Sequence, residues 1–316
     1  MRSETVRRVL RVVGIGVLVA GGSAPVAEAA VSSYPIAAPE PHVMVVAGAP
    51  IADPGAVVAI STADKGFRCG GTLIGSAVVV TAAHCVSDLP SRADPPGARP
   101  VTTERFTVRA GSVDRSAGGE VRSVAWVELY PDWTWATQSA RPIADIAVLG
   151  LSTPVRDVVP ARVGSPQPGR PVTVVGWGYT VAPTSAVVGG VAAMLPTPAP
   201  ALPTVLDVPL PTRLHSIPMR VVDPSHCRPA APGTQRGQVC LAPDGPVGGP
   251  CFGDSGTPAL QDGHIVVGIV SRGTDPVVQC GVGYAVVTDP GQYRAWITQT
   301  MTRHHQSLTD SRPVAR

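Results

Sequence analysis

The sequence predicts an all-β protein, for three reasons. Short valine-rich runs, typical of strands, recur along the chain between turns, for example at Ala56–Ile60, Ala77–Val80, Pro171–Val175 and His264–Val270. The 316 residues include 34 glycines and 35 prolines, which disfavour long helices. A helical pattern is found only near the end, at Gln292–Gln299, where we expect one short closing helix. The chain is long enough for one large β domain or two small ones.

The first 29 residues have the features of an export signal. Four arginines lead into the apolar stretch Val12–Ala20, and Ala27-Glu28-Ala29 is an Ala-x-Ala cleavage site. Such a short stretch cannot cross a bilayer, which takes about 20 residues. We therefore expect residues 1–29 to be a signal peptide, the product to be secreted, and the chain to have no stable membrane anchor.

The charge of the chain argues against a nucleic-acid partner. The formal net charge is +3, and residues 1–29 contribute much of it through four arginines and two glutamates. The rest of the chain is close to neutral, so neither a nucleic acid nor an anionic membrane is indicated as a partner.

All six cysteines follow the export signal, which indicates three disulfides formed in an oxidising compartment. The sequence alone does not choose among the pairings. A metal site is the rival interpretation, but no Cys-x-x-Cys pair or Cys/His cluster has ligand spacing. We expect no metal and no cofactor.

Two segments carry the main chemical signal. Gly253-Asp254-Ser255-Gly256-Thr257-Pro258 offers a serine nucleophile, and Thr81-Ala82-Ala83-His84-Cys85 offers a histidine base. A serine hydroxyl needs such a base, and the base needs an acceptor on its other ring nitrogen. Asp145 is the candidate, because it lies inside the apolar run Ile143–Leu149, where an ionised carboxylate needs a partner. A turn residue at a strand start is the alternative for Asp145.

On these motifs the chain resembles the chymotrypsin-like (trypsin family) serine proteases. The segments Cys69–Ile74, Gly176–Gly178, Ser271–Gly273 and Tyr284 also occur in family order. The chain order His, Asp, Ser differs from that of α/β-hydrolases, in which the serine comes first. The resemblance covers roughly residues 45–297 and suggests a secreted member of bacterial type.

The resemblance implies a fold of two packed antiparallel β-barrels, at about 45–160 and 161–297. It implies that Ser255 is the nucleophile, His84 the base and Asp145 its orienting acid, with the backbone N–H groups of Gly253 and Ser255 as oxyanion hole. It also implies the disulfides Cys69–Cys85, Cys227–Cys240 and Cys251–Cys280.

By the same resemblance, residues around the cleft form the substrate pocket: Gly249, Pro250, Ser271, Arg272, Gly273, Val282 and Gly283. Trypsin-like members carry an acid where this chain has Gly249, so we expect an uncharged, apolar side chain before the scissile bond. Arg272 departs from the family, which usually has an aromatic there. We expect it to point outward; if it turned inward, it could favour an acidic substrate residue.

A zymogen is also implied. Met44-Val45-Val46-Ala47-Gly48 resembles the new N-terminus that many family members expose by cleavage. We expect cleavage after Met44 and pairing of the Val45 α-amino group with Asp254. Residues 30–44 are then a propeptide or linker. We expect 181–211 to be an inserted loop and 298–316 a C-terminal tail that contains His304.

The expected partners are a protein or peptide substrate, with a protein inhibitor as a further candidate. Two other functions stay open from the sequence. One is an inactive protease-like protein that serves as a binding scaffold, since a fold does not guarantee a function. The other is an esterase that uses the same residues.

Overall fold

The computed structural model describes residues 48–88, 102, 105–134, 144–180, 209–227, 237–245, 248–274 and 283–310. These residues all belong to one of the two units into which the chain divides, Pro41–Arg316. The expected signal peptide, the propeptide, Val45, Cys280, Val282 and most of the 181–211 insert lie outside the described residues.

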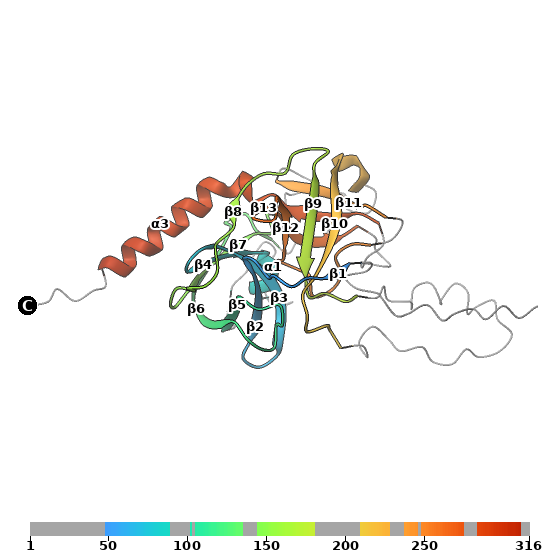
Figure 1. Ribbon diagram of the computed structural model, residues 1–316. Coiled ribbons are helices and arrows are strands. Elements are labelled where there is room, and N and C mark those ends of the chain that lie inside the picture. Colours follow the sequence, from blue (N-terminus) through green and yellow to red (C-terminus); the bar gives the residue numbers. More distant parts are fainter. Residues whose placement is uncertain are drawn as a thin grey trace, which may run out of the picture. The chain divides into compact units, whose positions relative to one another are not determined.

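Six antiparallel strands from the earlier part of the chain form a closed barrel, drawn from blue to green in Figure 1. Their order around the barrel is β2 (Val57–Thr62), β3 (Gly66–Gly75), β4 (Val78–Thr81), β7 (Ala147–Leu151), β6 (Glu120–Leu129) and β5 (Phe106–Ala110). Val58, Leu73 and Val79 are fully buried in this half. Closure leaves no free strand edge, so the barrel is a rigid support for the segments that leave its ends.

A second ring of six antiparallel strands follows, closed by the pairing of β10 with β9. Its members are β9 (Pro171–Gly176), β12 (Pro258–Gln261), β13 (Ile265–Gly273), β14 (Ala285–Thr288), β11 (Gln238–Pro243) and β10 (His215–Val222). Two-residue strands extend it, β1 (Ala49–Pro50) on β10 and β8 (Arg162–Val163) on β13. The prediction of an all-β fold with two antiparallel barrels is confirmed.

Helices are few in the described residues. They are the single turn α1 (Ala83–Val86), the 3-10 turns η2 (Pro224–Cys227) and η3 (Pro290–Tyr293), and the closing helix α3 (Arg294–Asp310). None of the described helices has both the length and the apolar composition needed to cross a bilayer.

The closing helix α3 is longer than we expected, because the structure continues it through much of the segment interpreted as a tail. Its later turns pack on the first barrel. The His304 ring stacks on Trp126 with centroids 3.7 Å apart, and His304 Nε2 lies 3.0 Å from Glu128 Oε1. Tertiary contacts of this kind stabilise helical turns that have little propensity of their own. His304 is therefore a packing residue of the helix and not a tail residue.

Candidate active site

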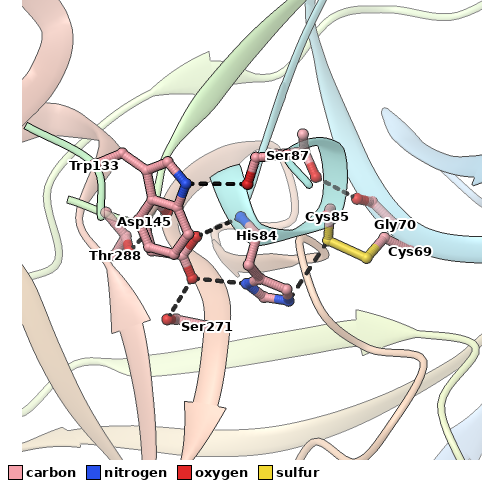
Figure 2. Close-up of polar contacts among 10 residues, drawn as sticks. Cys69, Gly70, His84, Cys85, Ser87, Trp133, Asp145, Ser271 and Thr288 are labelled. Atoms are coloured by element: carbon pink, nitrogen blue, oxygen red, sulfur yellow. Dashed lines mark hydrogen bonds and ion pairs between the residues drawn. A yellow bond between two sulfur atoms is a disulfide. The ribbon is translucent and has the colours of Figure 1, made fainter. Parts of the chain in front are cut away.

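The histidine and aspartate of the predicted triad are in direct contact. His84 lies in α1, the single turn that follows β4, and Asp145 lies two residues before β7, the neighbour of β4. His84 Nδ1 is 2.8 Å from Asp145 Oδ2, and the His84 backbone N–H donates to Asp145 Oδ1 at 2.9 Å (Figure 2). A carboxylate only accepts, so the Nδ1 proton is held by Asp145 and Nε2 is left as the basic nitrogen.

Asp145 is only 3 % exposed in its side chain, yet its carboxylate is fully supported by donors. Besides His84, Ser271 Oγ on β13 donates to Asp145 Oδ2 at 2.6 Å (Figure 2). Thr288 Oγ1 on β14 donates to the Asp145 carbonyl at 3.0 Å. Burial would raise the pKa of Asp145, but the attraction of His84 and the hydrogen bonds from His84 and Ser271 outweigh it, so the pKa lies below its ordinary value.

His84 has a raised pKa. Burial alone would lower the pKa of the imidazole, but the charge of Asp145 and the hydrogen bond to it outweigh burial. The imidazole side chain keeps 22 % exposure. Next to it, Trp133 Nε1 donates to Ser87 Oγ at 3.0 Å, which fixes the chain where it leaves α1 (Figure 2). The result is an oriented base whose protonated form is stabilised by a buried anion.

Ser255 is tied to the same region through the backbone. The Ser255 carbonyl accepts from the Gly70 N–H at 2.9 Å, and the Gly70 carbonyl accepts from Thr81 Oγ1 at 2.7 Å. Gly70 follows Cys69, which is disulfide-bonded to Cys85 beside the base. The serine loop is therefore bonded to β3, which is in turn bonded to the end of β4, the strand that leads into the histidine turn.

Glycines make the serine loop possible. Gly253 and Gly256 have φ of +97° and +78°, which side-chain-bearing residues rarely adopt. A Cβ on Gly256 would lie 2.4 Å from the Gly70 carbonyl oxygen, and one on Gly70 would lie 2.1 Å from Thr257 Cγ2. The loop and β3 therefore pack closely with no room for a side chain at Gly70 or Gly256, which keeps Ser255 close to the first barrel.

Asp254, beside the serine, is fully buried. Its Oδ1 accepts from the Gly178 N–H at 2.7 Å and its Oδ2 from the Cys251 N–H at 2.9 Å. Among the described residues, no cation forms an ion pair with it. Burial raises the pKa of Asp254 to about 7, against the smaller opposing effect of the two hydrogen bonds. Its expected partner Val45 lies outside the described residues.

The disulfides Cys69–Cys85 and Cys227–Cys240 are two of the three pairs that the resemblance implies. Cys251 is also disulfide-bonded, and its expected partner lies outside the described residues. Donor atoms of Cys69, His84 and Cys85 lie within 4.8 Å of one another, an arrangement that could suggest a metal site. Because the two sulfurs are bonded to each other, they are not thiolate ligands.

The family model described as Trypsin matches residues 46–191 and 203–297. The chain belongs to the trypsin family. It is therefore a serine endopeptidase. The chain is 28 % identical to a trypsin of Sarcophaga bullata over 252 residues, which cover 77 % of this chain and 82 % of that protein.

A trypsin of the insect Phaedon cochleariae is 32 % identical over 247 residues, covering 73 % of this chain and 78 % of that protein. Mouse neuropsin, described as a serine protease expressed in the limbic system, has a similar fold, with a TM-score of 0.60 at 22 % identity. That alignment covers 81 % of this chain and 99 % of neuropsin. These relatives are animal proteins, so the comparisons do not support the bacterial type that we expected.

The expected pocket residues of this trypsin-family chain lie on three segments. Gly249 and Pro250 are buried and lead into the serine loop. Gly273 ends β13 opposite Ala285, and Gly283 is exposed with a φ of +87°. Val282 lies outside the described residues.

Arg272 does not point outward as we expected. It is partly buried, and its Nη2 donates to Gln238 Oε1 on β11 at 3.0 Å. Burial lowers the pKa of Arg272, opposed by the attraction of Asp145. The pairing of β13 with β14 shifts register between Val270 and Arg272, and such a bulge interrupts the regular alternation of side chains.

Two residues near the site were missed or misread from the sequence. Ser271 was read as a pocket wall, but its hydroxyl is used by Asp145. Phe252 was not singled out, yet it is 51 % exposed three residues before Ser255, and its carbonyl accepts from the Tyr179 N–H at 3.0 Å. The Ser271 contact had no sequence signal, whereas a large apolar residue beside a nucleophile could have been noted.

Proposed function

We propose that this chain is a secreted endopeptidase that cleaves peptide bonds through an acyl-enzyme formed on Ser255. The observation that carries the proposal is the pair His84 Nδ1–Asp145 Oδ2 at 2.8 Å, with the Ser255 loop bonded to Gly70 beside it. In this mechanism Ser255 Oγ attacks the scissile carbonyl while His84 Nε2 takes the hydroxyl proton. The same proton then passes to the leaving amine, and a water molecule repeats the steps to release the acid.

Asp145 has two tasks in this mechanism. Its hydrogen bond holds the imidazole in one tautomer, and its charge stabilises the imidazolium that forms when His84 takes the proton. The lowered pKa of Asp145 supports this role, since the carboxylate stays ionised at neutral pH. The negative charge on the substrate oxygen would be stabilised by the backbone N–H groups of Gly253 and Ser255.

The primary pocket is proposed to accept an uncharged, apolar side chain. No acid stands at Gly249 or Pro250, so a substrate lysine would lose hydration without gaining a partner. Burying a leucine-sized side chain contributes roughly 1.5–3 kcal/mol. Peptides that differ only at the residue before the scissile bond test this, and a preference for Lys or Arg over Leu, Met or Phe contradicts it.

A serine-directed fluorophosphonate tests the proposed nucleophile. It should label the processed protein once, at Ser255, and Ser255→Ala should abolish the label. Ser225 on η2 is exposed, so Ser225→Ala is a matched control that should label normally. Failure to label the folded, processed protein would favour the inactive scaffold. Enzymes that form such acyl-enzymes generally hydrolyse esters faster than amides, so ester hydrolysis alone does not identify an esterase. An esterase is indicated only if the protein cleaves esters and no peptide.

Activation is proposed to follow cleavage after Met44. The new α-amino group of Val45 would enter the buried site at Asp254, whose raised pKa fits a carboxylate that forms no ion pair with any described cation. Pairing would order the loop that carries Gly253 and Ser255. N-terminal sequencing of the active form tests this, and full activity in a species that begins at Val31 contradicts it.

A further inference from the structure

A β-bulge in β13 lies at Ser271 and Arg272, next to Asp145. Val270 pairs with Val287 and Arg272 with Val286 on β14, so Ser271 is the extra residue between two consecutive pairs. In a bulge of this kind, two residues lie opposite one, and the normal alternation of side chains is interrupted. Ser271 Oγ donates to Asp145, and the charge of Asp145 acts on Arg272. The Ser271 side chain is therefore in contact with Asp145, and the Arg272 side chain is close enough to be influenced by its charge.

The Arg272 guanidinium is incompletely satisfied there. Its Nη2 donates to Gln238, but its Nη1 is buried without a hydrogen-bond partner. No carboxylate in the described residues forms an ion pair with it. Burying a cation without an acidic partner is unfavourable in free energy, and a partner of opposite charge removes much of that penalty.

The strand that carries Arg272 also has a free edge. Pairing with β12 ends at Pro258–Ile269, and two backbone bonds between Gly256–Thr257 and Val270 extend it as far as the serine loop. Beyond Val270, residues Ser271–Gly273 pair with β14 on one side only, within the part of the chain that the structure describes. An extended peptide added to this edge takes the place of β12 and runs directly past Ser255.

Direct neighbours on adjacent strands have their side chains on the same face, with Cβ atoms about 5 Å apart. A substrate residue opposite Arg272 thus has its side chain on the same face of the strand as the side chain of Arg272. We propose that Arg272 is a specificity-determining residue that selects substrates with Asp or Glu at one position before the scissile bond. This inference rests on the proposed function and names its substrate class: peptides with an apolar residue at the cleavage site and an acidic residue upstream.

The test uses pairs of peptides that share one cleavage site and differ only by Glu or Gln at one position upstream of it. A separate pair is made for each upstream position, and kcat/KM is compared within each pair. The wild-type protein should prefer Glu by about tenfold in kcat/KM at one position, the factor expected for a charge-assisted contact. Arg272→Gln should bring that ratio to about one. Arg272→Glu should favour Lys over Glu at the same position, and Arg272→Lys should keep part of the Glu preference.

Arg220→Gln is the matched control, because Arg220 is an exposed arginine on β10 that pairs with Asp244 and its loss changes the net charge equally. It should leave the Glu/Gln ratio unchanged. Each ratio is measured within one protein, so partial misfolding of a variant cancels. Hydrolysis without any Glu preference, or a Glu preference that survives in Arg272→Gln, contradicts the role of Arg272 but leaves the proposed peptidase function intact. No hydrolysis and no fluorophosphonate label overturn the proposed function as well.

Discussion

The site contains two buried carboxylates, Asp145 and Asp254, that are held in different ways. Asp145 has the ring of His84 and the hydroxyl of Ser271 as partners, and its pKa is lowered. Asp254 has two backbone N–H groups, and its pKa is raised to about 7. The pair of His84 and Asp145 is therefore held by contacts that include both barrels. Asp254, next to Ser255, has no described cation as a partner, which fits a carboxylate that pairs with a new N-terminus after cleavage.

The largest expected effect is at the nucleophile. Ser255→Ala should lower kcat by about 10⁶-fold, the size seen when a triad serine is removed in other proteases. Only one oxygen is lost, so the thermal transition should stay nearly the same. Peptide hydrolysis by purified Ser255→Ala, with Ser225→Ala as control, measures this. Retention of a few per cent of activity means that Ser255 is not the nucleophile.

The next largest effect should come from the histidine side. Asp145→Asn keeps the size of the side chain but lets an amide face His84 and favours the wrong tautomer, so kcat should fall about 10⁴-fold. Asp244→Asn, at an exposed aspartate paired with Arg220, is the control and should leave kcat unchanged. A loss in Asp145→Asn as small as in the control would mean that the assembled pair does not orient the base.

The serine side can be tested separately at Asp254. In the processed protein, Asp254→Asn removes the charge that would hold the new N-terminus, so the oxyanion donors lose their alignment and kcat should fall about 10²- to 10³-fold. In the unprocessed chain the same change should have little effect on activity. An equal effect in both forms would contradict the activation model.

Stability of the unprocessed chain should depend on pH through the same group. The folded-state pKa of Asp254 is raised from 3.8 to about 7, so the folded chain binds the proton more tightly than the unfolded chain. This contribution is fully present below about pH 4 and is lost as pH rises to about 7, by about 4 kcal/mol at most. Urea unfolding at several pH values should show this slope, and Asp254→Asn should remove it. A slope that persists in that variant assigns it to another group.

The smallest effect is expected at Ser271, a positioning residue. Its hydroxyl stabilises the charged form of Asp145, so Ser271→Ala should lower kcat by about tenfold or less. The acid limb of the kcat/KM profile should lie above 6.5 in the wild type, because the pKa of His84 is raised and only its neutral form acts as base. In Ser271→Ala the carboxylate holds the imidazolium more tightly, so this limb should move to higher pH. A purely structural role would lower activity without moving the limb.

The order of motifs along the chain was enough to predict the fold and the candidate triad. Each motif is a short segment that contains both a chemically reactive residue and the small residues that its turn requires. The contact of His84 with Asp145 follows from the antiparallel pairing of β4 and β7, and an isolated acid in an apolar run was its signal. The direction of Arg272 could not be predicted, since the bulge that sets it depends on the pairing of β13 with β14. Nor could the length of α3, whose later turns depend on Trp126 and Glu128.

By itself the sequence determined that strands dominate the fold, placed the glycines of the serine loop and pointed to Ser255, His84 and Asp145 as candidates for nucleophile, base and acid. Those properties belong to single residues or to short segments. Only the tertiary structure decided that Ser271 supports Asp145 and that Arg272 turns inward to Gln238. The physical reason is distance along the chain: 126 positions separate Ser271 from Asp145, and only the packing of one barrel against the other brings their oxygen atoms within 2.6 Å.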